Sequence, residues 1–159
     1  IRKIGAVGLA LGLASASTAL AALQYMDARS TPEALGQSDY KAINQKQDVR
    51  AYGYFSEGHA PRDFESWKKG YADTKSVSVQ FGSTAPDPGA GQINWALPVA
   101  ISSLSEDGKV TVYAGCYQIH LTNPGMQTDP PFQPMSINGA KLSLSDKPVQ
   151  DSIPNSCAP

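Results

Sequence analysis

Two long, largely apolar segments, residues 93–105 and 109–122, limit the possible folds of this chain more than any other feature. They flank Asp107 and Gly108, a pair of residues typical of a two-residue type I′ turn. Strands joined by such a turn pair in the antiparallel direction, and a hairpin this long needs further strands or helices to bury its side chains. The sequence therefore predicts a long β-hairpin at the centre of an antiparallel sheet.

The predicted turn also determines which residues of the two strands lie opposite one another. With Asp107 and Gly108 as the turn, Trp95 lies opposite His120. One face of the hairpin then carries Trp95, Leu97, Val99, Ile101, Val112, Ala114, Cys116, Gln118 and His120. The other face carries Ala96, Pro98, Ala100, Tyr113, Tyr117, Ile119 and Leu121.

Both predicted faces are largely apolar, although a sheet covered by helices on one side needs only one apolar face. Either the C-terminal tail and the proline-rich segment 123–134 cover the second face, or another subunit does. We expect Tyr113, Tyr117 and Ile119 to form an exposed patch, through which two copies of the chain associate as a homodimer.

Three segments ahead of the hairpin have helical periodicity. The first follows Ser30-Thr31-Pro32-Glu33, which supplies a hydroxyl N-cap, a proline and an early carboxylate, and it presents Leu35, Asp39, Ala42 and Ile43 at helical spacing. The second covers residues 48–55. The third covers residues 62–71 and is capped by Asp63 or a neighbour.

The remaining segments complete an α+β pattern. Residues 76–81 alternate as a half-buried strand, residues 82–91 form a loop, and residues 137–144 form a last strand with a bulge at Gly139. We therefore predict three N-terminal helices packed on one curved antiparallel sheet of about four strands.

The N-terminus has the pattern of a secretory signal peptide. Arg2 and Lys3 precede an uncharged apolar run, which leads to the small-residue site Ala19-Leu20-Ala21. The alternative is a membrane anchor, but the second half of the uncharged stretch is Ser, Thr and Ala. We expect a signal peptide over residues 1–21, a linker over 22–29, one domain over 30–145 and a tail over 146–159. The mature protein would then lack a stable membrane anchor and would be periplasmic or secreted.

Export changes the interpretation of the two cysteines. Cys116 and Cys157 are an even pair in an oxidising compartment, so a structural disulfide that ties down the tail is the natural pairing. The alternatives are two free thiols or a redox pair, although a redox pair usually has a C-x-x-C spacing.

Charge and motifs exclude several classes of function. Thirteen basic residues against fourteen acidic ones leave a net charge of -1, with no excess of basic residues for nucleic acid. We find no nucleotide, hydrolase or calcium motif, no spacing that makes a metal site from the two histidines, and no sign of a cofactor.

The order of elements resembles the cone-shaped fold shared by nuclear transport factor 2, ketosteroid isomerase and the polyketide cyclases. The resemblance is closer to a group of uncharacterised exported bacterial proteins of this fold. It covers residues 29–144 and rests on the segments Arg29-Ser30-Thr31-Pro32-Glu33-Ala34-Leu35, Tyr40-Lys41-Ala42-Ile43-Asn44, Arg50-Ala51-Tyr52, Gly70-Tyr71-Ala72-Asp73-Thr74, Gly89-Ala90-Gly91-Gln92, Gly115-Cys116-Tyr117 and Pro130-Pro131-Phe132-Gln133-Pro134. The resemblance implies a fold and an exported location but no activity.

This fold implies a pocket between the concave face of the sheet and the helices. We expect it to be lined by Tyr40, Tyr52, Trp67, Tyr71, Trp95, Gln118 and His120. Asp39 and His120 are candidates for an acid–base pair, because a carboxylate can orient and charge an imidazole. The alternative is that Asp39 is a solvated helix residue and His120 is bonded to backbone or water.

We favour a non-catalytic exported domain that binds a small apolar ligand or a protein partner. One alternative is an enzyme of the cyclase, isomerase or dehydratase type that uses the pocket. Another is a dimeric interaction module whose cone is filled by its own side chains.

Overall fold

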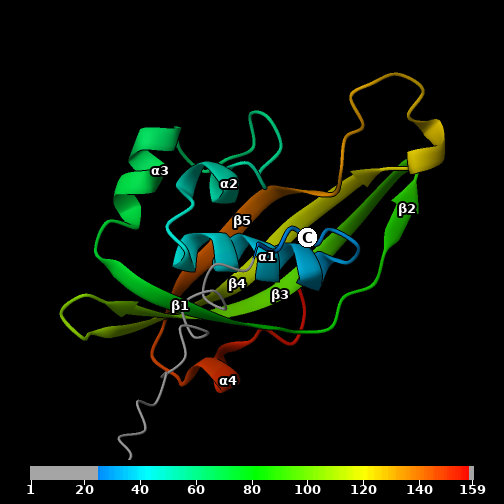
Figure 1. Cartoon of the computed structure of the whole chain (residues 1–159). Helices are drawn as coiled ribbons and strands as arrows, with labels where there is room; N and C mark the ends of the chain where they lie inside the picture. The colour runs from blue at the N-terminus through cyan, green and yellow to red at the C-terminus, as the bar shows by residue number, and fades with distance from the viewer. Residues whose placement is uncertain (1–24, 158–159) are drawn as a thin grey trace, which may run out of the picture.

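The computed structural model describes residues 25–157, so the predicted signal peptide and part of the predicted linker lie outside the described residues. Three helices precede the first strand in this part of the chain (Figure 1): α1 (Pro32–Asn44), α2 (Asp48–Tyr52) and α3 (Phe64–Gly70). The second helix is shorter than expected, because the residues after Gly53 leave the helix and run beside β5.

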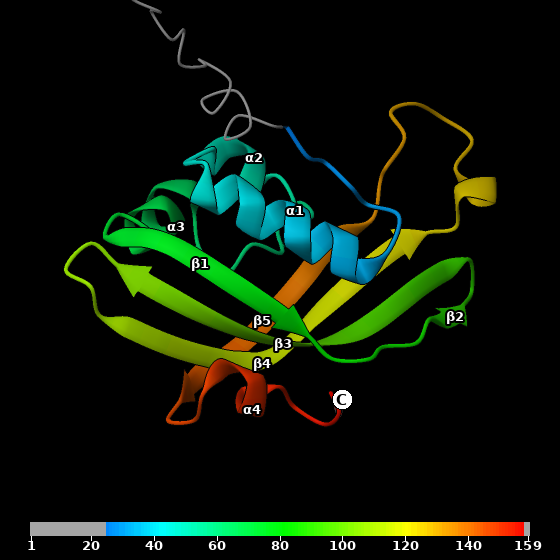
Figure 2. The same ribbon diagram turned by 60° about the horizontal axis from the view of Figure 1, so that its bottom comes forward.

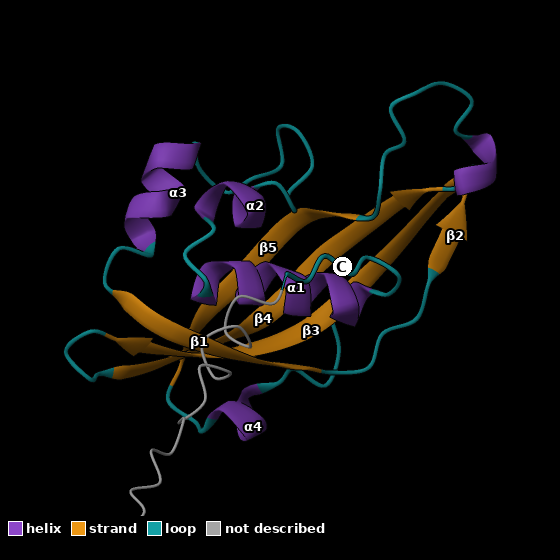
Figure 3. Cartoon of the chain, viewed as in Figure 1, coloured by secondary structure: helices purple, strands orange, loops and turns teal. Residues whose placement is uncertain are grey.

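The strands form one antiparallel, curved sheet. They are β1 (Thr74–Phe81), β2 (Asp87–Gly89), β3 (Gln92–Ser105), β4 (Val110–Thr122) and β5 (Ser136–Ser145). The order across the sheet is β1-β3-β4-β5, and the short β2 pairs with β3. The sheet thus has five strands, since the predicted loop 82–91 contains β2. The proline-rich connection from β4 to β5 is irregular apart from a 3₁₀ turn at Pro124–Met126 (Figure 3).

Helices lie on both sides of the sheet (Figure 2). On the concave side, α1 packs against β1 and β3, while α2 contacts α1 and α3. On the convex side, α4 (Val149–Ser152) contacts β3 and β4. Most of the core lies between α1 and the concave face, where Leu35, Ile43, Leu97 and Val99 are buried.

Side-chain caps begin two of the helices, as the sequence predicts. The hydroxyl of Thr31 accepts a hydrogen bond from the amide of Ala34 at 3.1 Å at the start of α1. The carboxylate of Asp63 accepts one from the amide of Ser66 at 3.0 Å at the start of α3. Each cap satisfies an amide that has no partner within its helix.

The turn between β3 and β4 has three residues and not two. The amide of Ser105 donates to the carbonyl of Lys109 at 2.9 Å, which leaves Glu106, Asp107 and Gly108 as the loop. Gly108 has φ +87°, the left-handed conformation that closes a three-residue turn of this kind. The predicted type I′ turn is therefore wrong.

The longer turn shifts the register of the hairpin by one residue. Trp95 lies opposite Ile119, and His120 lies opposite Asn94, so the predicted pairing of Trp95 with His120 is wrong. A shift of one residue moves every side chain of one strand to the other face of the sheet. Tyr117 consequently joins Leu97 on the concave face, whereas His120 is on the convex face.

The predicted exposed patch is not present, because its residues face the helices. Tyr117 and Ile119 are 3% and 1% exposed, and Tyr113 is half-buried. The tail of the same chain packs on part of the convex face, where α4 contacts β3 and β4. Ile153 of the tail also lies close to Gly82, since a Cβ there would be 3.1 Å from the Ile153 side chain. A homodimer stays a prediction, but it would have to use other residues.

The disulfide between Cys116 and Cys157 is confirmed, with the two Cα atoms 5.8 Å apart. Cys116 is on the convex face of β4, so the bond fixes the tail across the sheet. The tail is more ordered than expected, because α4 also packs on the strands.

The edge strand β5 is irregular at its start. Asn138 is an extra residue between the pairs Gln118–Gly139 and Ile119–Ile137, which places the bulge next to the predicted position. The backbone of Ile137 also pairs with the segment after α2: its amide donates to Tyr54 at 2.8 Å, and its carbonyl accepts from Ser56 at 3.0 Å.

Candidate functional site

A pocket of about 350 Å³ lies between α3 and the paired strands β4 and β5. Most of its lining is aromatic or aliphatic, and comprises Phe55, Pro61, Trp67, Tyr71, Tyr117, Ala140 and Leu142. Arg62 and Ser66 are the exposed polar residues that border it. The volume of the pocket and its mainly apolar lining are both typical of sites that bind small organic molecules.

An aromatic cluster forms the helical side of this pocket. The ring centroid of Trp67 lies 4.9 Å from that of Tyr71 and 5.6 Å from that of Tyr52, and Tyr52 lies 5.2 Å from Phe64. The hydroxyl of Tyr52 donates to the carbonyl of Arg62 at 2.9 Å, which ties α2 to the segment before α3. Edge-on and tilted contacts of this kind hold the rings in place.

Two buried tyrosines connect the pocket to α1. The hydroxyls of Tyr40 and Tyr117 share a short hydrogen bond, and their rings stack with centroids 6.4 Å apart. Tyr40 is 2% exposed and Tyr117 is 3% exposed, but only Tyr117 lines the pocket. Tyr40 therefore lies behind Tyr117 as seen from the pocket.

Asp39 is a buried carboxyl beside these tyrosines. It is 2% exposed, and its Oδ1 atom has no hydrogen-bond partner among the described residues. Burial raises the pKa of Asp39 to about 8, an effect that the nearby Arg50 guanidinium opposes only in part. The carboxyl is therefore mostly protonated at neutral pH, and the expectation of a solvated helix residue is wrong.

Arg50 does not form an ion pair with Asp39, because its guanidinium is occupied elsewhere. It donates to Gln47 Oε1 at 2.6 Å, to the hydroxyl of Tyr54 at 2.9 Å and to the carbonyl of Met26. These bonds tie the segment ahead of α1 to α2, and they leave Arg50 close enough to influence Asp39 without neutralising it.

The tyrosines around Asp39 are neutral hydrogen-bonding groups. Burial raises the pKa of Tyr71 and of Tyr117, and the charge that Asp39 would carry when ionised raises both further. The polar groups at this end of the pocket are thus uncharged hydroxyls backed by an uncharged acid.

The structure brings together four of the seven predicted pocket residues. Tyr71 and Trp67 line the pocket, Tyr52 supports it, and Tyr40 lies behind it. Tyr117 was not among the predicted pocket residues, because the predicted register placed it on the other face of the hairpin. No pattern along the hairpin could have identified it, because both faces of the predicted hairpin are apolar and the pairing of Tyr117 with Leu97 depends on the length of the turn.

Trp95 and Gln118 lie at a different part of the sheet. They border a hollow formed with the segment after β1 and with the tail at Cys157. Neither residue lines the pocket beside α3.

His120 lies in a third hollow, together with His59. Its Nε2 atom contacts the side-chain oxygen of Gln92. It is on the opposite face of β4 from Tyr117, so the described residues do not bring it together with Asp39 as an acid–base pair.

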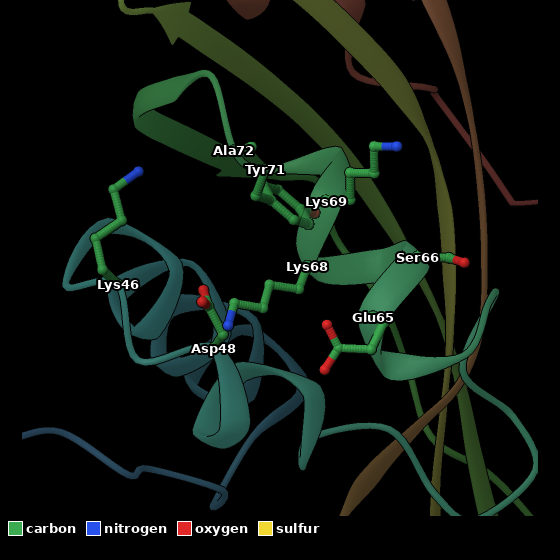
Figure 4. A pocket seen from close by; sticks show the side chains of 8 residues that line it. All are labelled: Lys46, Asp48, Glu65, Ser66, Lys68, Lys69, Tyr71 and Ala72. Atoms are coloured by element: carbon green, nitrogen blue, oxygen red, sulfur yellow. The ribbon is translucent and has the colours of Figure 1, made fainter.

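A charged hollow adjoins the aromatic pocket on the other side of α3 (Figure 4). Lys46 and Asp48 border it from the α1–α2 side, and Glu65, Lys68 and Lys69 border it from α3. Tyr71 lines both this hollow and the aromatic pocket. Because both signs of charge are present, the hollow shows no preference for an anion or a cation.

Residues 25–157 contain neither a metal-binding cluster nor a membrane-spanning helix. No three His, Cys, Asp or Glu side chains in this part of the chain lie close enough together to hold a metal ion. None of its helices combines the length and the apolar character needed to cross a bilayer.

Comparison with known proteins gives little that is specific. No protein-family model matches the chain, and no curated protein matches its sequence. Among solved structures, the fold aligns with an NTF2-like protein of unknown function from Exiguobacterium sp. 255-15. The two share 13% identity with a TM-score of 0.39, over 70% of this chain and 98% of the other. Similarity at this level supports neither family membership nor a function.

Proposed function

We propose that this protein is a non-catalytic binding domain that holds a small, largely apolar molecule in the pocket between α3 and strands β4 and β5. The observation that carries the proposal is the lining of that pocket, where aromatic and aliphatic side chains from four parts of the chain surround a volume of about 350 Å³. A space of this size and character is favourable for an apolar ligand, because binding removes apolar surface from water on both partners.

Two alternatives have less support. A module with a filled cone would leave no such pocket beside Tyr117. An enzyme of the cyclase or isomerase type would need an acid or base in contact with its substrate, and neither Asp39 nor His120 lines this pocket. The binding function therefore fits the arrangement better.

We further propose that the protein works outside the cytoplasm, in the periplasm or after secretion. The support is the Cys116–Cys157 disulfide, because such bonds persist mainly in oxidising compartments. Fractionation of cells that produce the full chain tests this, since recovery in the cytoplasm with reduced cysteines would contradict it.

The binding function is tested with N-phenylnaphthylamine, a neutral apolar probe whose fluorescence rises in apolar surroundings. Leu142 lines the pocket, whereas Leu144 is two residues along the same strand and 72% exposed. We expect the wild-type protein to bind the probe saturably. Leu142→Trp should weaken binding at least tenfold by filling the pocket, and the matched control Leu144→Trp should bind as the wild type does. Equal binding by both variants would place the probe elsewhere and refute the proposed site.

A further inference from the structure

The C-terminal tail is attached to the convex face of the sheet at few points. Its helix α4 contacts β3 and β4, but none of the four helical residues is buried. The hydroxyls of Ser145 and Ser152 share a hydrogen bond of 2.8 Å at the start of the tail. Farther on, the side chains of Ile153 and Pro98 meet beside Gly82, where an added Cβ atom would be 3.1 Å from the first and 2.8 Å from the second. These contacts bury little apolar surface, so they hold the tail only weakly.

The disulfide is the remaining attachment, and it lies at the end of the tail. Within residues 25–157, no hydrogen bond joins residues 154–157 to the rest of the chain, and the bond between Cys116 and Cys157 fixes this segment on β4. Both cysteines are half-buried rather than enclosed, and Cys157 borders the hollow on this face. A thiolate from solvent therefore has access to the bond.

The main core of the fold does not include the tail. It lies between α1 and the opposite face of the sheet, where Leu97, Val99 and Tyr117 are buried. Segments with few buried apolar contacts open at a much lower free energy than the whole domain, and a four-residue helix has little stability of its own. Loss of the disulfide should therefore free the tail and leave the sheet and α1 folded.

The tail also forms one side of the hollow on the convex face. Residues 155–157 border this space of about 420 Å³ on one side, and the segment after β1 and the strand residues Asn94 and Gln118 border it on the other. Gln118 is two residues from Cys116 on the same strand, so its side chain is on the face that carries the disulfide. Because tail residues make up one side, the hollow exists only while the tail is in place.

We propose that the Cys116–Cys157 bond is a redox switch: its reduction releases residues 146–157 from the convex face and opens the hollow there, while the domain stays folded. The reductant is a dithiol, such as that of a thiol–disulfide oxidoreductase. One thiolate of the dithiol attacks a sulfur of the bond and forms a mixed disulfide, which its second thiol then resolves. The dithiol loses two electrons and two protons and becomes a disulfide, and Cys116 and Cys157 become two thiols. This switch does not involve the pocket beside α3, so its test is independent of the proposed binding function.

Hydrogen–deuterium exchange of the full chain, followed by mass spectrometry of its peptides, tests the proposal. The protein is compared in its oxidised form and after reduction with dithiothreitol. We expect the amides of residues 149–157 to exchange at least about tenfold faster after reduction, because the tail is no longer held. Amides of β3 and β4 should keep their protection, and far-UV circular dichroism should show an intact fold.

The double variant Cys116→Ser, Cys157→Ser provides the control, because it lacks the bond without any reductant. Its tail should exchange as the tail of the reduced wild type does, and dithiothreitol should change nothing further. If the tail amides of the reduced wild type stay protected, α4 and Ile153 hold the tail without the disulfide and the proposal is refuted. It is equally refuted if β3 and β4 lose protection together with the tail, since the disulfide would then support the whole domain.

Discussion

Gly115 on β4 lies directly against the backbone of Lys141 on β5: a Cβ atom at position 115 would be 1.8 Å from the Lys141 carbonyl oxygen. Since that oxygen is part of the backbone, it cannot rotate away as a flexible side chain would. We expect Gly115→Ala to lower the free energy of unfolding by about 1–3 kcal/mol through overpacking. Urea denaturation measures the change.

Gly139 is the matched control for this prediction, because it is also on the β4–β5 pair but has room. A Cβ there would be 3.8 Å from the nearest atom, in Gln118, which is an ordinary contact. Gly139→Ala should change the stability by less than about 0.5 kcal/mol. A similar loss in both variants would mean that the close approach at Gly115 is not the cause.

Removal of the disulfide should destabilise the oxidised protein alone. Cys116 and Cys157 are 41 residues apart, and closing a loop of that length contributes roughly 4 kcal/mol in the chain-entropy model. We expect Cys157→Ala to lower the melting temperature under oxidising conditions and to match the wild type in the presence of a reductant. If the variant melted earlier than the wild type in reductant as well, packing of the Cys157 side chain would be responsible.

Asp39 should make stability depend on pH. Burial raises its pKa from 3.8 to about 8, so the folded protein binds this proton over a pH range where the unfolded chain has released it. Stability from this group is therefore complete below about pH 4 and is lost as the pH rises towards 8, with a slope of up to about 1.4 kcal/mol per pH unit.

The variant Asp39→Asn tests whether Asp39 causes this pH dependence, because the asparagine amide is neutral at every pH in the range studied. Urea denaturation at intervals from about pH 5 to pH 8 should give a flatter profile for the variant and a greater stability than the wild type at the alkaline end. The control is Asp146→Asn, a change of the same kind at an exposed position, which should keep the wild-type slope. An unchanged slope in Asp39→Asn would show that another group carries the dependence.

The Tyr40–Tyr117 hydrogen bond should appear as a coupling in a double-mutant cycle. Each single change to phenylalanine leaves the other buried hydroxyl without its partner and should cost about 1–3 kcal/mol. The double variant has no orphaned hydroxyl, so it should lose less than the sum of the two, with a coupling of about 1 kcal/mol. Additive losses in thermal or urea unfolding would mean that the two hydroxyls are not bonded in solution.

The helix caps and the four longer strands could be predicted from the sequence because each depends on local patterns. Thr31 and Asp63 are at positions where a side-chain oxygen can reach a free amide, whatever the rest of the chain does. The two cysteines could be paired from their number and the predicted compartment.

The hairpin register could not be predicted with the same success. Asp107 and Gly108 are compatible with both turn lengths, since glycine adopts the left-handed conformation that either turn needs. Alternation did not distinguish them, because both faces of the hairpin are apolar. The register is decided by the contact between the sheet and α1. Tyr117 faces Tyr40 on α1 only when the turn has three residues.

That one-residue shift also accounts for the errors in the candidate site. It placed His120 with Trp95 on the concave face and Tyr117 on the convex face, whereas the structure has His120 and Tyr117 the other way round. Asp39 was recognised as a candidate, but its burial depends on the packing of α1 against α2 and against strands β1 and β3, which no local pattern encodes. The helix α4 was missed because its four residues are too few to show periodicity.

The backbone pairing of Ile137 with Tyr54 and Ser56 has a consequence for how copies of this protein meet in concentrated solution. An unpaired edge strand is a template for strands of neighbouring molecules, and β5 is such an edge. Here the segment after α2 occupies the first part of that edge, the bulge at Asn138 interrupts it, and Lys141 places a charge on the remainder. The edge therefore resists edge-to-edge pairing with strands of other molecules, although its later part beside the pocket has no strand partner among the described residues.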